Sequence, residues 1–204
     1  NMVSLDTIGL RTGTDKSSAH HNYLHTYEKY FAPLRDKNIL LFEAGVGGYT
    51  FANRGGESLR MWCEYFKQGR VITIDLYDKT QIVTPNNAEV YKCSQTDGEN
   101  IIRILNNRQP DIIIDDASHI NPLTITTFQI MFPLLKSGGI YVVEDTETSY
   151  WSAVATDGTD FKGGDHPNTV MNYFKRKCDE VNLIEKTDIE SVCFVKGLII
   201  IKKL

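Results

Sequence analysis

The chain has 204 residues, of which 41% are hydrophobic and 24% charged, and its formal net charge is -4. These values are ordinary for a globular protein and predict one domain over residues 1–204. Residues 1–37, which precede the first expected strand, are expected to form an N-terminal helical segment that caps this domain. The negative charge and the scattered basic residues argue against nucleic acid as a partner. Neither a signal peptide nor a run of roughly 20 apolar residues is visible, so we expect a cytoplasmic protein without membrane contact.

The four cysteines show no C-x-x-C spacing and lie in or beside apolar segments. Buried thiols in a reducing compartment explain this pattern better than a disulfide framework or a zinc site.

Short runs rich in β-branched residues alternate with longer amphipathic stretches, which is typical of parallel strands joined by crossover helices. The expected strands are Asn38 to Val46, Arg70 to Tyr77, Glu89 to Ser94, Asp111 to Asp116 and Gly139 to Asp145. The expected helices are Ser58 to Phe66, Asn100 to Asn107, Leu123 to Leu135 and Thr169 to Val181.

The end of the chain departs from this alternation. Ile189 to Val195 and Leu198 to Lys202 are separated only by Lys196 and Gly197, so they must pair as an antiparallel hairpin. We therefore predict an α/β fold with a Rossmann-like, doubly wound sheet of seven strands, mostly parallel, with a C-terminal antiparallel β-hairpin. The Gly- and Asp-rich segment Thr156 to His166 is a candidate lid.

Glycines and polar residues follow the first three strands. The turn Gly45-Val46-Gly47-Gly48 lets the backbone bend sharply and approach a ligand, although a tight turn with no ligand is the alternative. Asp75 ends the second strand, where a carboxylate can accept both ribose hydroxyls of an adenosine. Ser94 ends the third expected strand, and Gln95 follows it. Together these strand ends predict a crevice that binds adenosine.

Two acidic pairs follow the next two strands. Asp115 and Asp116 end one apolar run, Glu144 and Asp145 end the next, and His119 lies three residues beyond the first pair. Carboxylate oxygens with one imidazole are suited to metal-assisted proton removal. The alternatives are that the aspartates cap the following helix and that the histidine is a polar surface residue.

Several motifs together resemble the metal-dependent class I S-adenosylmethionine sugar O-methyltransferases of the macrolide type, such as those of mycinamicin and tylosin biosynthesis. The resemblance extends from about Gly13 to Val181. Its motifs are Gly13-Thr14-Asp15-Lys16, Gly45-Val46-Gly47-Gly48-Tyr49, Arg54-Gly55-Gly56-Glu57-Ser58-Leu59-Arg60-Met61-Trp62, Ile74-Asp75-x-x-Asp78-Lys79, Asp115-Asp116-Ala117-Ser118-His119 and Glu144-Asp145-Thr146-x-Thr148-Ser149-Tyr150-Trp151.

This resemblance implies roles for individual residues. The implied contacts to S-adenosylmethionine are made by Lys16, Glu43, Gly45, Gly47, Ser58, Asp75, Ser94, Gln95 and Asp115. The implied ligands of Mg²⁺ are Asp116, Glu144 and Asp145, and the implied base is His119. Tyr150 and Trp151 are either platforms for the sugar ring of the acceptor or core aromatics.

The implied function is O-methylation of a hydroxyl on a sugar or a glycosylated natural-product or polysaccharide precursor. The alternatives are a non-sugar acceptor (a polyketide hydroxyl, a catechol or an acidic capsule-type precursor), a non-catalytic adenosine-binding partner, and an enzyme with carboxylate-held iron. Self-association through residues 157–167 or through the exposed hairpin edge is a further expectation, which makes the protein a candidate homo-oligomer.

Overall fold

The computed structural model describes residues 2–151 and 167–204, and the chain divides between Ser94 and Gln95 into two units. The candidate lid from Thr156 to His166 and most of the segment expected to support self-association lie outside the described residues. Every helix in the described ranges is too short or too polar to cross a bilayer. A cytoplasmic location and a single domain over the whole chain stay predictions.

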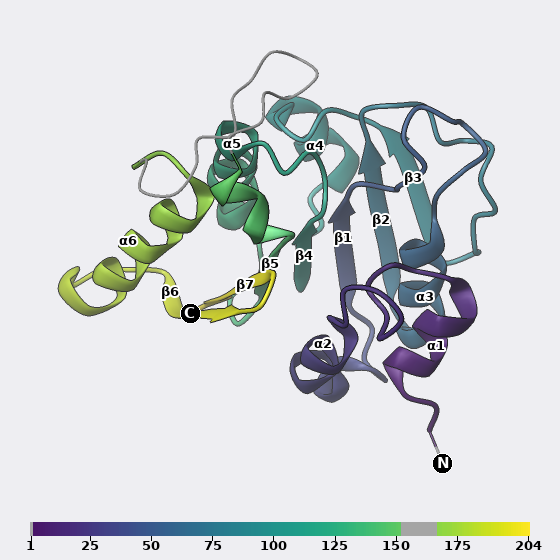
Figure 1. The fold of residues 1–204 in the computed structure, drawn as a ribbon, viewed down its shortest axis with the longest axis horizontal. Coiled ribbons are helices and arrows are strands. Elements are labelled where there is room, and N and C mark those ends of the chain that lie inside the picture. Colours follow the sequence, from purple (N-terminus) through teal and green to yellow (C-terminus); the bar gives the residue numbers. More distant parts are fainter. Residues whose placement is uncertain (1, 152–166) are drawn as a thin grey trace. The chain divides into compact units, whose positions relative to one another are not determined.

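The first unit contains three parallel strands with helices packed on them (Figure 1). Its elements are α1 (Leu5–Thr12), α2 (Leu24–Phe31), the 3-10 helix η1 (Ala32–Leu34), β1 (Leu40–Ala44), α3 (Glu57–Tyr65), β2 (Arg70–Asp75) and β3 (Ala88–Lys92). The strand order is β3-β2-β1, and all five residues of β1 are buried, as expected for a strand covered on both faces. The region expected to be helical before the first strand thus contains two helices and one 3-10 turn.

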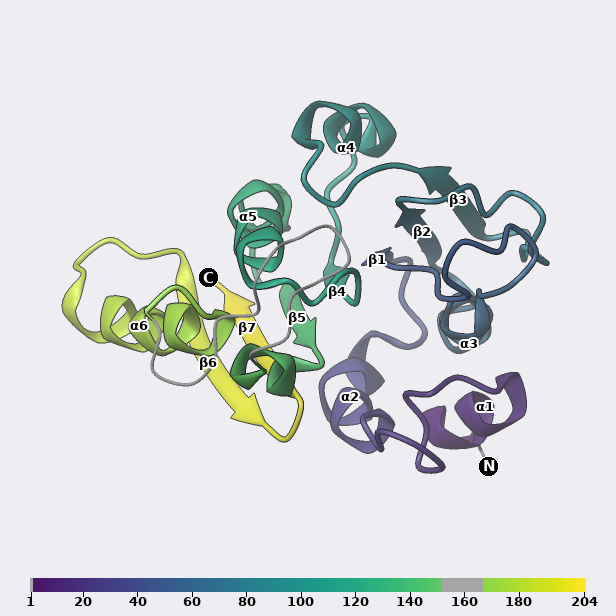
Figure 2. The same ribbon diagram turned by 45° about the horizontal axis from the view of Figure 1, so that its top comes forward.

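Helices α1 and α3 lie side by side in the first unit, and α3 also contacts β2 (Figure 2). Trp62 on α3 packs edge-on against Tyr27 and Phe31 of α2, with ring centroids 5.3 and 5.6 Å apart. Such edge-to-face pairs bury large apolar area in a favourable geometry. This aromatic cluster fixes α2 against α3.

The second unit has one parallel strand pair followed by the antiparallel hairpin. Its elements are α4 (Gly98–Leu105), β4 (Ile112–Asp115), α5 (Asn121–Met131), η2 (Phe132–Leu134), β5 (Ile140–Glu144), η3 (Thr146–Tyr150), α6 (Val170–Leu183), β6 (Ile189–Val195) and β7 (Leu198–Lys203). The strand order is β4-β5-β7-β6, so β7 lies between β5 and β6. The seven expected strands and the antiparallel hairpin are therefore all present.

Phe128 on α5 is the centre of the second unit's core. Its ring lies 5.0 Å from the ring of Tyr141 on β5 and 4.9 Å from that of Phe174 on α6, both in edge-to-face geometry. The helix that carries Phe128 begins two residues earlier than expected, with Pro122 in its first turn, where proline is tolerated. It gives way to a 3-10 turn at Phe132, next to Pro133, which cannot continue an α-helix.

The first five strands end slightly earlier than the sequence patterns predict, and the polar residues at their ends explain two cases. β2 stops at Asp75 because the Asp75 carboxylate accepts a hydrogen bond from the backbone N–H of Tyr77, 2.9 Å away, which turns the chain. β5 stops at Glu144 because Asp145 has a left-handed backbone with φ 53°. Both differences affect residues of the candidate site.

All four cysteines are free thiols. Cys63 and Cys93 are buried, and Cys178 and Cys193 are half-buried. Burial, and to a smaller extent the negative charge of Glu43, raises the pKa of the Cys63 thiol to about 12. This thiol is therefore neutral and unreactive at physiological pH.

Candidate active site

The glycine turn after β1 is bound to the end of β2. Gly45 donates its backbone N–H to the carbonyl of Ile74 at 2.8 Å, and Val46 donates to Asp75 Oδ2 at 3.0 Å. Gly45 and Gly47 have φ values of 102° and 83°, which residues with a Cβ rarely adopt. The Asp75 carboxylate thus orients the turn, and it keeps lone pairs with which to accept further hydrogen bonds.

The loop of residues 49–56 closes back on this turn. Gly56 donates its N–H to the carbonyl of Val46 at 2.8 Å, and a Cβ added to Gly48 would lie 2.3 Å from the backbone of Arg54. The buried Lys79 donates from Nζ to the carbonyl of Phe51 at 2.9 Å. This closed loop is the reason that α3 starts several residues after the glycine turn, unlike the helix of a dinucleotide-binding fingerprint.

Gly55 is the position where this loop tolerates least change. Its φ is 103°, and an added Cβ would lie 2.4 Å from the carbonyl oxygen of Gly47. We expect Gly55→Ala to lower the free energy of unfolding by more than the roughly 1–3 kcal/mol typical of backbone strain alone, because the clash adds to it. Urea denaturation measures this loss. Gly138→Ala is the matched control, since Gly138 has φ 76° but open space around the added Cβ, and equal losses would contradict the proposed contact.

Glu43 at the end of β1 is buried among donors from the same unit. Its carboxylate accepts hydrogen bonds from Ser58 Oγ at 2.6 Å and from Trp62 Nε1 at 3.2 Å, and Lys16 Nζ lies 3.4 Å from Oε2. Lys16 and Glu43 are each 1% exposed. The structure therefore brings together three of the residues expected to bind the cofactor, and it shows what joins them.

Ser94 and Gln95, the two residues predicted to lie near an adenine, follow β3. Ser94 is half-buried, whereas the Gln95 side chain is buried and used within the protein. Gln95 Nε2 donates to Thr127 Oγ1 at 2.9 Å, and Gln95 Oε1 accepts from the backbone N–H of Ser118 at 3.3 Å. The Gln95 amide thus links α5 to the loop that carries His119.

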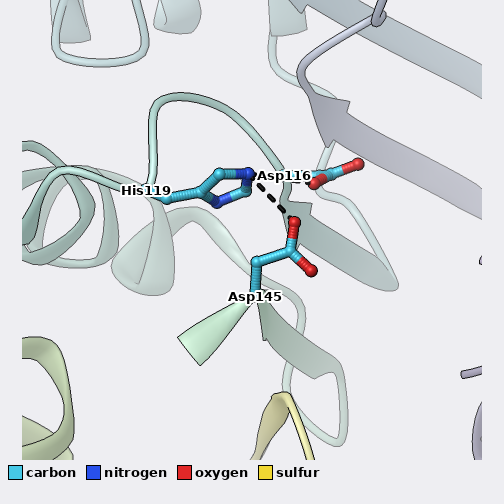
Figure 3. Close-up of side chains that lie close together, drawn as sticks. All are labelled: Asp116, His119 and Asp145. Atoms are coloured by element: carbon cyan, nitrogen blue, oxygen red, sulfur yellow. Dashed lines mark ion pairs between the residues drawn. The ribbon is translucent and has the colours of Figure 1, made fainter. Parts of the chain in front are cut away.

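Asp116, His119 and Asp145 converge in the second unit (Figure 3). His119 Nε2 lies 3.1 Å from Asp145 Oδ2 and 3.6 Å from Asp116 Oδ1, and one ligand atom from each of the three residues lies within 4.8 Å of the others. Two oxygens bound to one Mg²⁺ at roughly 2.0–2.1 Å are at most about 4.2 Å apart, so the cluster needs little adjustment to share an ion. Two carboxylates and one imidazole are suitable donors for a divalent cation.

The charge of this cluster controls the imidazole. Burial lowers the pKa of His119, but the hydrogen bond to Asp145 and the charges of Asp116, Asp145 and Asp115 outweigh this effect and raise it to about 9. His119 and Asp145 both have left-handed backbones, with φ 59° and 53°. Such conformations cost energy at non-glycine residues and often occur at functional sites.

The two remaining acidic residues at the strand ends are buried. A Glu144 oxygen lies within 4.8 Å of an Asp116 oxygen. Asp115 is 2% exposed; its Oδ1 accepts from the backbone N–H of Ala117, and its Oδ2 has no hydrogen-bond partner within the described part of the chain. Burial raises the pKa of Asp115 to about 7. A buried carboxylate with an unpartnered oxygen is suited to receive a hydrogen bond from a ligand.

Tyr150 and Trp151 are about half exposed, at 49% and 53%, so they are not core aromatics. The sequence patterns gave no role to Thr148, whose Oγ1 donates to the carbonyl of His119 at 3.2 Å. They also did not reveal Thr127, the partner of Gln95. Isolated threonines carry no signal in a sequence when their partners are distant along the chain. The assignments of cofactor, metal and base residues stay predictions.

Known proteins resemble the chain over most of its length. No family model matches it. It is 40% identical to the 8-demethyl-8-alpha-L-rhamnosyl tetracenomycin-C 2'-O-methyltransferase of Streptomyces olivaceus, with 91% of this chain and 47% of the relative covered. It is 37% identical to the mycinamicin VI 2''-O-methyltransferase of Micromonospora griseorubida, with 72% of this chain and 37% of the relative covered.

A solved structure is similar over the whole chain. The MycE methyltransferase from the mycinamycin biosynthetic pathway, in complex with Mg, SAH and mycinamycin VI, matches with a TM-score of 0.88 and 30% identity, over 100% of this chain and 55% of that one. The chain thus spans about half the length of the relatives it matches. The resemblance and the fold class predicted from the sequence are confirmed. The chain is a homologue of the sugar O-methyltransferases of natural-product pathways, and its fold is the Rossmann-like methyltransferase fold of MycE.

Proposed function

We propose that this protein is an S-adenosylmethionine- and Mg²⁺-dependent O-methyltransferase that acts on a sugar hydroxyl of a glycosylated small molecule. The observation that carries the proposal is the convergence of Asp116, His119 and Asp145 within 4.8 Å in a chain whose relatives methylate such molecules. Nucleic acid and membranes have no part in this proposal.

The two units have different proposed roles. In the first unit, Gly45, Gly47 and Asp75 are the residues that would hold the adenosyl donor, because the turn exposes backbone and Asp75 can accept from ribose hydroxyls. Glu43, held by Lys16 and Ser58, would border the donor's methionine part. In the second unit, Gln95 is the residue predicted to lie near the adenine. Its side-chain oxygen accepts a hydrogen bond from the backbone N–H of Ser118, the residue before His119.

Asp116, Glu144 and Asp145 would hold the cation through carboxylate oxygens, which Mg²⁺ prefers. When bound, the ion supplies positive charge that lowers the pKa of the acceptor hydroxyl. Beside that charge, the imidazole of His119, whose pKa is otherwise about 9, would be held in the neutral form that a base requires.

His119 would then take the hydroxyl proton at Nε2, the nitrogen that faces the two carboxylates. The oxygen forms a bond to the methyl carbon as the carbon–sulfur bond breaks, and the bonding electrons stay on sulfur, which becomes a neutral thioether. Asp145, 3.1 Å from Nε2, stabilises the imidazolium that results.

The test is an assay of the purified protein with S-adenosylmethionine, Mg²⁺ and a panel containing a rhamnosylated polyketide, its aglycone and a catechol. We expect a methylated product only from the glycoside, because the sugar hydroxyl is the proposed acceptor. Removal of divalent ions with EDTA should abolish turnover, and added Mg²⁺ should restore it. Mass spectrometry locates the methyl group. Methylation of the aglycone or catechol alone, or full turnover in EDTA, would overturn the proposal.

A further inference from the structure

The loop between β4 and α5 carries Asp116 and His119, and its backbone is held in an unfavourable shape. His119 has φ 59°, in the left-handed region. A non-glycine residue in such a conformation typically costs about 1–3 kcal/mol and persists only where neighbouring groups hold it. The groups that bind the backbone on either side of the imidazole therefore decide where the ring lies.

Thr148 on η3 forms hydrogen bonds to the backbones of His119 and Asp145, the two residues of the closest ion pair in the cluster. Its Oγ1 donates to the carbonyl of His119 at 3.2 Å, and its backbone N–H donates to the carbonyl of Asp145, also at 3.2 Å. The residue is 7% exposed, so water does not readily replace these hydrogen bonds. A single residue thus ties the base-bearing loop to the turn that follows β5.

Gln95 binds the same loop one residue earlier. Its Oε1 accepts from the N–H of Ser118, while its Nε2 is fixed by Thr127 of α5. Thr127 Oγ1 in turn donates to the carbonyl of Leu123, within α5. The backbone before His119 is therefore anchored at the N–H of Ser118, by Gln95, and the backbone after it is anchored at the carbonyl of His119, by Thr148.

Catalysis by a positioned base is sensitive to small displacements. A misplacement of about 1 Å can cost roughly 10²-fold in rate. We propose that Thr148 is a positioning residue: its hydroxyl, by holding the His119 carbonyl, keeps Nε2 directed at Asp145 and at the acceptor hydroxyl. This inference rests on the proposed function, in which His119 is the base.

The experiment compares three variants at saturating S-adenosylmethionine and Mg²⁺. Thr148→Val keeps the shape and removes the hydroxyl, and we expect kcat to fall by about 10- to 100-fold. Thr148→Ser keeps the hydroxyl and should restore most of kcat. Thr124→Val is the matched control, because Thr124 is also buried but its hydroxyl has no hydrogen-bond partner in the described residues, and kcat should be unchanged.

Binding of S-adenosylhomocysteine, measured by calorimetry, separates positioning from a general structural role. We expect Thr148→Val to leave this affinity and the KM for the acceptor close to those of the unmodified protein. Wild-type kcat in Thr148→Val, no recovery in Thr148→Ser, or a loss of S-adenosylhomocysteine affinity that matches the loss of kcat would each overturn the inference. If His119→Ala lowers kcat while Thr148→Val does not, only the positioning role fails. If His119→Ala turns over normally, the assignment of His119 as the base fails as well. If the unmodified protein transfers no methyl group to any acceptor, the proposed function itself fails.

Discussion

His119→Ala is expected to lower kcat by about 10²- to 10⁴-fold, the usual contribution of a positioned general base. The reason is geometric as well as chemical: Nε2 lies 3.1 Å from Asp145 and 3.6 Å from Asp116, so alanine removes the proton acceptor from the centre of the cluster. The measurement is single-turnover methyl transfer, which excludes product release from the observed rate.

The affinity for S-adenosylhomocysteine distinguishes loss of the base from loss of the fold. It should be unchanged in His119→Ala, because the glycine turn and Asp75 in the first unit are the proposed donor site. Asp116→Asn should behave in the same way, with binding retained and turnover lost. His25→Ala serves as a control, since His25 is an exposed histidine that bonds only its neighbour Thr26 in the described contacts, and its kcat should match the unmodified protein. A normal rate in His119→Ala would remove the imidazole from the mechanism.

Lys16→Met has the largest expected effect on stability, a loss of about 3–5 kcal/mol in the free energy of unfolding. Lys16 Nζ lies 3.4 Å from Glu43 Oε2, and both residues are 1% exposed. Methionine fills a similar volume but leaves the buried carboxylate of Glu43 without the positive charge beside it. The cost of that buried charge, more than the lost attraction, dominates the effect.

Two further variants make this expectation specific. Adding Glu43→Gln to Lys16→Met should recover much of the loss, because glutamine is neutral and still accepts a hydrogen bond from Ser58. Lys136→Met removes a pair with Asp111 of similar length, 3.3 Å, but Lys136 is 50% exposed, and exposed pairs contribute about 0–1 kcal/mol. Urea denaturation compares all three. Equal losses in Lys16→Met and Lys136→Met would contradict the role given to burial.

The sequence patterns predicted the fold well because two local signals, apolar runs and a very short link between strands, are strong in this chain. Buried runs such as Ile112 to Ile114 have no polar face, which indicates a strand covered on both sides, and β4 lies there. The two-residue link at Lys196 and Gly197 allowed only an antiparallel hairpin, and β6 and β7 pair in this way. The ends were less predictable, because side chains such as Asp75 stop a strand through hydrogen bonds that periodicity does not encode.

The same reasoning predicted that the acidic residues lie close together, but it did not predict the hydrogen bonds that fix the loops carrying them. Parallel strands end at one edge, so residues just beyond β4 and β5 had to lie close, and Asp116 and Asp145 do. The left-handed backbone of His119 and the hydrogen bond from Thr148 depend on the relative placement of two loops, which no local pattern specifies. Gln95 shows the same limit, since its bond to Thr127 joins residues far apart along the chain.

The place of β7 between β5 and β6 has a consequence for biosynthesis. Glu144 at the end of β5 pairs with Leu198, so one edge of β5 stays open until the ribosome has released residues 198–203. Until then an apolar strand offers unpaired backbone groups to other nascent chains, a situation that invites aggregation. A premature stop codon before Leu198 would thus remove more than a surface hairpin, because it would leave the strand that leads into Asp145 without its second neighbour.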